Sequence, residues 1–305
     1  MTGLDLSVRI GSMTMKNPVM IASGIFGYGD EFKGLADYGD LGALVLKTIT
    51  REPRAGNPPA HRTAETPAGM VNAIGLENVG MEAFLRDKLP IALEYGTNII
   101  ASIAGDTAED FAECARALDA TDVAALEINI SCPNVKKGGM AFGVDADASA
   151  EVTAAVRAAT EKPIISKLTP NVTDIAAVAV ACERAGADAI SLINTVSAMA
   201  IDVETRRPLL AAGSGGLSGP AIRPAAVYRV HQVAQAVKAP VIGMGGIWNA
   251  NDALEFIIAG ASAVAVGTAL YADPAAAHRV LDGIRSYLER HELPSLTDFV
   301  GSVQL

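Results

Sequence analysis

A cysteine between two asparagines marks the part of the chain with the clearest chemical potential. Segment 129–134 reads Asn-Ile-Ser-Cys-Pro-Asn and directly follows the apolar run 124–128. Cys132 is the only obvious proton-transfer or nucleophilic group there, and Pro133, Asn134 and the lysines beyond them indicate a loop. A lone cysteine can also be a small buried hydrophobic residue. The polar neighbours favour a reactive thiol, since cysteine reactivity depends on an exposed, electropositive setting.

Two glycine-containing turns predict a phosphate site. Segment 243–247 reads Gly-Met-Gly-Gly-Ile and segment 267–269 reads Gly-Thr-Ala, and each follows an apolar run and opens a helical segment. Backbone N–H groups at such turns bind phosphate, commonly in the loops after the seventh and eighth strands of α/β barrels. The alternative is that the glycines only allow tight turns. No dinucleotide-binding glycine motif follows a strand, so a mononucleotide such as flavin mononucleotide (FMN) is favoured.

Lysines and asparagines at the ends of other apolar runs suit a flavin and a small, planar, amide-rich carboxylate. Lys167 would lie beside the flavin ring and stabilise negative charge on its reduced form, and Lys47 would offer the substrate a positive charge. The alternatives are that the lysines are exposed and that each asparagine is only a turn residue. Because the carboxyl ends of barrel strands converge on one site, we expect the group to lie together. Its neutral members are Asn72, Asn129, Asn134, Asn194 and Thr195.

Short apolar runs alternate with longer amphipathic segments along the chain. Eight such pairs predict an α/β fold of the (β/α)8 or TIM barrel type, with a doubly wound parallel sheet as the alternative. Several helical segments open with Asp, Asn or Thr and close with Gly. The predicted helices include 107–118, 148–159, 174–185, 224–237 and 251–259. The predicted strands are 19–22, 43–47, 98–103, 125–129, 164–168, 189–193, 241–244 and 263–266.

An N-terminal hairpin and three insertions interrupt this alternation. Residues 8–10 and 13–15 flank a Gly-Ser turn and predict an N-terminal hairpin that closes the floor of the barrel. Long Gly- and Pro-rich connections, 48–78 and 194–222, follow the second and sixth strands, and a further insertion follows the fourth. Long loops inside a compact domain are usually functional. We therefore expect residues 1–305 to form one FMN-binding barrel domain with its insertions at the active face.

Composition narrows the classes of function. The net charge is −10 and no cluster of Lys and Arg occurs, which argues against a nucleic-acid partner and for a small-molecule substrate. The three cysteines, Cys114, Cys132 and Cys182, lie far apart, so neither a metal site nor an iron–sulfur cluster nor a disulfide framework is indicated. No stretch approaches the roughly 20 apolar residues of a membrane span. The N-terminus has no basic region that leads into an apolar run, which is the pattern of a secretory leader. We expect a cytoplasmic protein without membrane association.

Many motifs together indicate a family. The chain resembles dihydroorotate dehydrogenases over nearly its whole length. With a cysteine at position 132, the chain resembles the cytoplasmic class 1 enzymes of that family. The membrane-associated class 2 enzymes have serine at that position. The matching segments are 17–19, 22–24, 47–48, 72–78, 129–134, 136–139, 166–171, 193–195, 216–220, 243–247 and 266–268.

The resemblance implies oxidation of dihydroorotate to orotate in de novo pyrimidine (UMP) biosynthesis, with FMN as the immediate hydride acceptor. It implies that Cys132 is the base that takes a proton from the substrate ring. Ser102 departs from the family, which has asparagine at that position. The implied substrate contacts are Lys47, Asn72, Ala73, Ile74, Gly75, Leu76, Asn129, Asn134, Asn194 and Thr195. The implied FMN contacts are Ser23, Lys47, Thr48, Ser102, Asn129, Lys167, Ile193, Gly219, Gly245, Gly246, Gly267 and Thr268.

Two segments are similar to subclass 1B, whose electrons pass to NAD: the pair Asn194 and Thr195, and segment 26–29, which reads Phe-Gly-Tyr-Gly. Subclass 1B enzymes are heterotetramers of two catalytic and two electron-transfer subunits, and the latter carry FAD and a [2Fe–2S] cluster. This chain lacks the cysteines for that cluster, so the partner must supply it. The alternatives are a fumarate-dependent class 1A enzyme, another FMN barrel oxidoreductase acting on a reduced pyrimidine, and a non-catalytic binding barrel.

Overall fold

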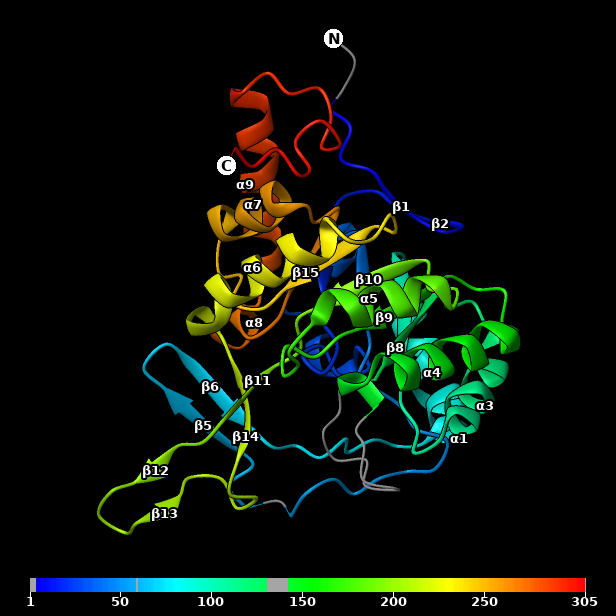
Figure 1. Ribbon diagram of the computed structural model, residues 1–305, viewed down its shortest axis with the longest axis vertical. Coiled ribbons are helices and arrows are strands. Elements are labelled where there is room, and N and C mark those ends of the chain that lie inside the picture. The colour runs from blue at the N-terminus through cyan, green and yellow to red at the C-terminus, as the bar shows by residue number, and fades with distance from the viewer. Residues whose placement is uncertain (1–3, 59, 131–141, 305) are drawn as a thin grey trace.

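A closed barrel of eight parallel strands forms the centre of the computed structural model, which describes residues 4–58, 60–130 and 142–304. Strands that follow one another among the eight are also neighbours in the barrel (Figure 1). The predicted (β/α)8 barrel is confirmed, and each predicted run contains one observed strand. The doubly wound alternative is wrong, because the sheet closes on itself. The strands are β3 (Val19–Ile21), β4 (Ala43–Val45), β7 (Asn98–Ile103), β8 (Ala125–Asn129), β9 (Ile164–Lys167), β10 (Ala189–Leu192), β15 (Val241–Met244) and β16 (Ala263–Val266).

Helices cover the outside of the barrel, and several of them begin at capping side chains. The hydroxyl of Thr107 accepts a hydrogen bond from Asp110 N at 3.1 Å, and the Asp110 carboxylate accepts one from Thr107 N at 2.9 Å. This pair of bonds fixes the start of α3 (Ala108–Asp119). Each predicted helical segment overlaps an observed helix. Over the described ranges, no helix has the length and apolar character needed to span a membrane.

The α-helices are α1 (Met81–Ala83), α2 (Leu89–Leu93), α3 (Ala108–Asp119), α4 (Ala146–Ala159), α5 (Ile175–Arg184), α6 (Arg223–Ala234), α7 (Ala250–Ala259), α8 (Ala269–Ala272) and α9 (Ala276–Arg290). Short 3-10 or π turns add η1 (Asp30–Phe32), η2 (Tyr38–Asp40), η3 (Phe84–Lys88), η4 (Phe142–Val144) and η5 (Pro220–Ile222).

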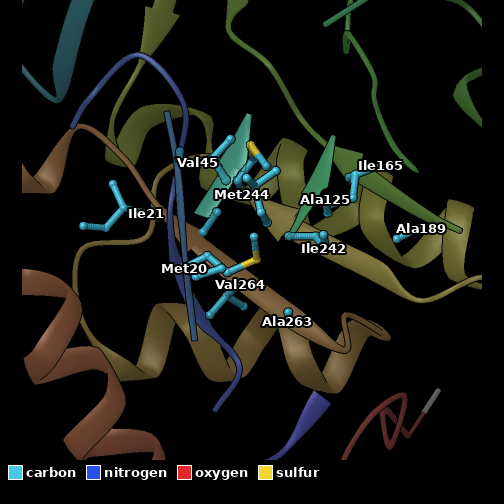
Figure 2. Close-up of a cluster of buried hydrophobic side chains, with 14 of the residues drawn as sticks. Met20, Ile21, Val45, Ala125, Ile165, Ala189, Ile242, Met244, Ala263 and Val264 are labelled. Carbon is cyan, nitrogen blue, oxygen red and sulfur yellow. The ribbon is translucent and has the colours of Figure 1, made fainter. Parts of the chain in front are cut away.

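Aliphatic side chains of different sizes fill the core around the strands. Met20, Ile165 and Ile242 lie in one buried cluster with the much smaller Ala125 and Ala189 (Figure 2). Large and small side chains interdigitate in this way to give a packed core rather than a pore. The eight strands contain no aromatic residue, in keeping with an aromatic content of only 5%.

The N-terminal hairpin pairs β1 (Val8–Ile10) with β2 (Met13–Met15). Ile10 and Met15 are completely buried. Asn98, the first residue of β7, donates its side-chain N–H to the carbonyl of Thr14 at 3.1 Å. The hairpin therefore packs at the amino-terminal end of the barrel, the floor position that its sequence predicts.

The two long connections pair with each other, which the sequence did not predict. Strands β5 (Thr63–Thr66) and β6 (Gly69–Asn72) come from the first, and β11 (Val196–Ala198) and β14 (Gly215–Ser218) from the second. They form an antiparallel sheet in the order β11-β14-β6-β5, which lies beside the barrel, and the small hairpin of β12 (Ile201–Asp202) and β13 (Arg207–Pro208) extends away from it (Figure 1).

Candidate active site

A cavity of about 1120 Å³ lies at the carboxyl end of the barrel, between the strand ends and the antiparallel sheet. Its lining combines residues that end or follow most barrel strands with residues of β6, β14 and the segments beside them. Carboxyl ends of parallel strands are where barrel enzymes place their chemistry. The position and volume of the cavity suit a ligand of cofactor size together with a small substrate.

The structure brings nearly all the predicted site residues to this cavity. Ser102 is the one described exception, and Cys132 and Asn134 lie outside the described residues. The roles assigned to individual residues stay predictions. The predicted residues that line the cavity are Ser23, Lys47, Thr48, Asn72, Ala73, Ile74, Gly75, Leu76, Asn129, Lys167, Ile193, Asn194, Thr195, Gly219, Gly245, Gly246, Gly267 and Thr268.

Ser102 supports the cavity wall from behind. It is completely buried, and its hydroxyl lies 2.9 Å from Thr48 Oγ1. Asn129 Nδ2 donates to the same Thr48 oxygen at 3.1 Å. Ser102 therefore supports Thr48 directly and Asn129 only through Thr48, and direct contact between Ser102 and a flavin stays a prediction.

A buried carboxylate that the sequence analysis missed lies under the cavity. Glu127 Oε1 is 3.5 Å from Lys167 Nζ, and Lys167 Nζ donates to Ser23 Oγ at 3.1 Å. Ser191 Oγ donates to the other carboxylate oxygen of Glu127 at 3.3 Å. The signal was present in the sequence, because Glu127 is a charged residue in an apolar run two positions before Asn129 and so lies on the same strand face.

Lys47 brings a second positive charge to the cavity. Its side chain is half-buried, and its backbone N–H donates to Gly27 O at 2.8 Å, which fixes the residue just beyond β4. Within the described part of the chain, no carboxylate lies within ion-pairing distance of its ammonium group. Its charge is therefore available to an anionic ligand.

The glycine turns after β15 and β16 form a cradle that fits a phosphate. Gly246 has a φ of +86°, and a Cβ atom built there would lie 2.9 Å from the carbonyl oxygen of Gly219. The backbone N–H groups of Gly246, Gly267 and Thr268 donate to no acceptor among the residues described. Such unpaired N–H groups beside a cavity make a suitable phosphate site.

Amide side chains fix the opposite wall. Asn72 ends β6 and donates to Gly216 O of β14 at 3.3 Å, which ties the two insertions together. Asn171, which the sequence analysis did not assign to the site, also lines the cavity; its amide donates to Thr195 O at 3.1 Å and accepts from Ser197 N at 2.9 Å. It holds the chain between β10 and β11, and its place in the matching segment 166–171 was the available signal.

A closed (β/α)8 barrel with a polar cavity at its carboxyl end is the architecture of barrel enzymes, which place their chemistry there. The chain belongs to the dihydroorotate dehydrogenase family, whose family model matches residues 5–288.

Its curated relatives span almost the same length. It is 55% identical over 300 residues, or 98% of each chain, to "Dihydroorotate dehydrogenase B (NAD(+)), catalytic subunit" of Trichlorobacter lovleyi. It is 54% identical to the protein of the same name from Desulforudis audaxviator, over 97% of this chain and 96% of that one. The corresponding protein of Bacteroides thetaiotaomicron is 51% identical over 99% of each chain.

Proposed function

We propose that this chain oxidises dihydroorotate to orotate in pyrimidine biosynthesis, as the catalytic subunit of an NAD-linked enzyme. Relatives that are more than half identical over nearly the whole chain carry that name. The observation that supports the proposal most directly is one cavity that gathers two lysines, Lys47 and Lys167, with the amides of Asn72, Asn129 and Asn194. This set suits a planar ring with amide groups and a carboxylate.

We further propose that residues 1–305 form one domain that holds FMN in this cavity. The N–H groups of Gly246, Gly267 and Thr268, which have no acceptor within the described ranges, fit its phosphate, and the buried ammonium of Lys167 fits the electron-rich edge of its ring. When bound, FMN supplies the acceptor for the hydride that leaves the substrate. The proposed contacts are Ser23, Lys47, Thr48, Ser102, Asn129, Lys167, Ile193, Gly219, Gly245, Gly246, Gly267 and Thr268.

The residues of the chain itself bind and orient the substrate and move a proton. Asn72, Asn129, Asn194 and Thr195 would hold the ring, together with Asn134, because neutral amides can pair with each of its N–H and C=O groups. Lys47 would neutralise the carboxylate. Cys132, proposed as the base, would take the proton from ring carbon five, so that it is lost as the hydride leaves carbon six.

A partner subunit completes the proposal. The relatives are named as catalytic subunits of NAD(+) enzymes, which favours NAD over fumarate as the final acceptor. We propose that the partner carries FAD and a [2Fe–2S] cluster in a heterotetramer of two catalytic and two electron-transfer chains, located in the cytoplasm. The three cysteines of this chain are too few and too dispersed to ligate such a cluster.

Anaerobic titration of the purified chain with dihydroorotate tests the activity. Flavin absorbance that bleaches in proportion to added dihydroorotate, with orotate formed, supports both the cofactor and the substrate. A yellow protein that stays yellow would contradict the substrate, and a colourless one that binds no added FMN would contradict the cofactor. Reoxidation of the bleached protein by fumarate alone, without a partner, would contradict the NAD-linked assignment.

A further inference from the structure

We propose that Asn57 and Asn78 are positioning residues that hold segment 73–76 so that its backbone N–H groups bind the substrate carboxylate. The proposal rests on the proposed function, because it concerns the same substrate. Neither residue belongs to the set of substrate and cofactor contacts given above. Both act through carbonyl groups of the cavity wall.

Three carbonyl groups of the segment accept hydrogen bonds from Asn57 or Asn78. Asn57 donates to the carbonyl of Ala73 through Nδ2 and to that of Ile74 through its backbone N–H, each at 2.9 Å. Asn78 Nδ2 donates to Leu76 O at 2.8 Å. In a trans peptide the N–H points opposite to the C=O of the same plane, so the N–H groups of Ile74 and Gly75 point away from Asn57. Within the described ranges, the N–H groups of residues 74–76 donate to no acceptor.

The segment has a backbone conformation that requires support. Leu76 has a φ of +56° and Gly75 a φ of +80°. A left-handed conformation is unfavourable for a residue with a side chain and is found where the surroundings impose it, often at functional sites. A Cβ atom at Gly75 would lie 2.6 Å from Asn57 N, so the two stretches approach too closely for any other residue. The bond from Asn78 to the Leu76 carbonyl is therefore well placed to maintain this turn.

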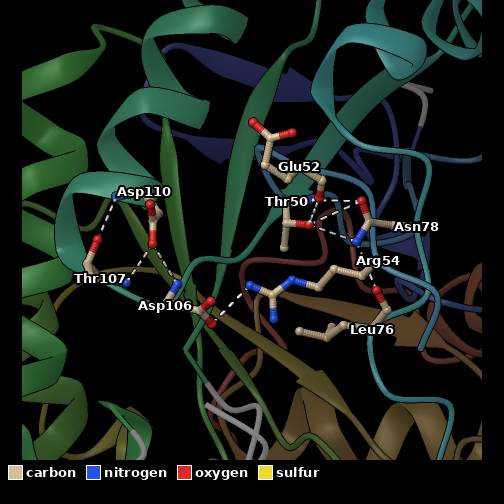
Figure 3. Close-up of polar contacts among 8 residues, drawn as sticks. All are labelled: Thr50, Glu52, Arg54, Leu76, Asn78, Asp106, Thr107 and Asp110. Carbon is tan, nitrogen blue, oxygen red and sulfur yellow. Dashed lines mark hydrogen bonds and ion pairs between the residues drawn. The ribbon is translucent and has the colours of Figure 1, made fainter. Parts of the chain in front are cut away.

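Both polar atoms of the Asn78 side chain make hydrogen bonds, which fix its orientation. Its Oδ1 accepts from Gly80 N at 2.9 Å. Its Oδ1 also accepts from Thr50 N at 3.2 Å, and its Nδ2 donates to Thr50 Oγ1 at 2.9 Å (Figure 3). Asn78 as a whole residue is only 6% exposed. Such a fully satisfied buried amide has one well-defined orientation.

An ion pair anchors the same stretch to the barrel. The backbones of Arg54 and Asn78 exchange hydrogen bonds of 3.0 and 2.9 Å. The guanidinium of Arg54 lies 2.9 Å from Asp106, just before the cap of α3 (Figure 3). The turn that holds Leu76 is thus connected to the loop after β7, and the position of its N–H groups is set by the barrel.

The charges around the segment favour an anion. Lys47 lines the same cavity without a described carboxylate partner, whereas Arg62 is paired with Glu77 at 2.8 Å. A carboxylate near residues 74–76 would therefore meet oriented N–H donors together with the Lys47 ammonium. Charge-assisted hydrogen bonds of this kind are the stronger ones in proteins.

The test uses the full chain loaded with FMN and follows anaerobic flavin reduction by stopped flow over a range of dihydroorotate concentrations. This separates the dissociation constant from the limiting rate. Asn78→Ala removes the tie to Leu76, and Asn57→Ala, at a half-buried position, removes the tie to Ala73 with less risk to folding. Asn17→Ala is the matched control. Asn17 precedes the first barrel strand and is 5% exposed, and among the described residues its side chain bonds only to backbone groups of Val19 and Asp40.

We expect both test variants to raise the dissociation constant of dihydroorotate at least about tenfold, the loss of one charge-assisted hydrogen bond, while the limiting rate changes less. Orotate affinity measured by calorimetry should fall in parallel. Asn17→Ala should lower the melting temperature without changing either affinity. Unchanged affinities in both test variants, or an equal loss in Asn17→Ala, would overturn the positioning role. A wild-type flavin that dihydroorotate does not bleach would instead overturn the proposed function.

Discussion

Glu127 Oε1 lies 3.5 Å from Lys167 Nζ, with the two side chains only 2% and 6% exposed. Their strands are neighbours, and Ser191 and Ser23 complete the group at its two ends. A buried carboxylate offsets much of the positive charge of a buried ammonium group beside it. The charge that a flavin ring would meet at Lys167 is therefore set by Glu127, which itself does not line the cavity.

Glu127→Gln tests this relationship. Removing the negative charge leaves the Lys167 ammonium uncompensated, so the reduced flavin gains stabilisation and its reduction potential should rise. The free energy of unfolding should fall by roughly 1–3 kcal/mol, because a buried charge loses its partner. Equilibrium with a reference dye measures the potential. Ser191→Ala, which keeps both charges, is the control, and a potential that rises equally in both variants would rule out a charge effect.

Gly246→Ala should weaken the binding of FMN. The residue has a φ of +86°, and the added Cβ would meet the Gly219 carbonyl in the proposed phosphate cradle. We expect the dissociation constant of FMN, measured by the fluorescence of released flavin, to rise at least about tenfold, since any shift of the N–H donors costs more than about 1.4 kcal/mol. Gly34→Ala is a matched control with a φ of +85° and no atom near its Cβ. Equal flavin loss in the two variants would show that backbone conformation alone is responsible.

Cys132→Ser should lower the rate of flavin reduction at neutral pH by a factor of about 10² to 10⁴, the usual contribution of a general base. The reason is that a hydroxyl gives up its proton far less readily than a thiol. A cysteine ordinarily ionises near pH 8.5, so the wild-type rate should rise between about pH 7 and 9. Rapid-mixing absorbance at several pH values measures both. Cys182→Ala removes a thiol buried outside the cavity and should keep the wild-type profile. Full activity of Cys132→Ser at neutral pH would exclude this base.

Stability should decline at alkaline pH through Cys114. Burial raises the pKa of the Cys114 thiol to about 12, well above its value in the unfolded chain. Between these values the unfolded thiol ionises while the native thiol stays protonated, so the native state binds more protons and its stability falls as pH rises. Urea unfolding at about pH 8 and pH 10.5 measures this loss. It should be smaller in Cys114→Ala, and an equal loss in both proteins would contradict the assignment.

The barrel could be predicted from sequence because each of its strands is identified locally. Runs such as 189–193 and 263–266 are short, apolar and rich in Val, Ile and Ala, and a glycine closes the helix before each. The lining residues at the strand ends, such as Lys47, Asn129 and Lys167, followed from the same pattern, since a polar residue at the end of a buried strand has few other reasons to be there. Segment 73–76 and Gly219, by contrast, were implied only by the resemblance to the family.

The wall of the cavity could not be predicted in this way. Strand β14 contains Gly215 and Gly216 and has no alternating pattern, and its register against β6 depends on contacts with a segment far away in sequence. Asn57 and Asn78 resemble ordinary loop asparagines until the carbonyls that they contact are known. Glu127 was overlooked for a different reason, because its partner Lys167 is on another strand and only the closed barrel brings the two together.

The pairing of β6 with β14 also has a consequence for the order of folding. Asn72 and Gly216 are 144 residues apart in the chain, and their strands can meet only after the intervening part of the barrel has brought their ends together. Each barrel strand, by contrast, pairs with one that comes soon before or after it, apart from the closing pair of β3 and β16. We therefore expect the barrel to serve as the template on which this wall of the cavity assembles, so that the cavity is completed late in folding.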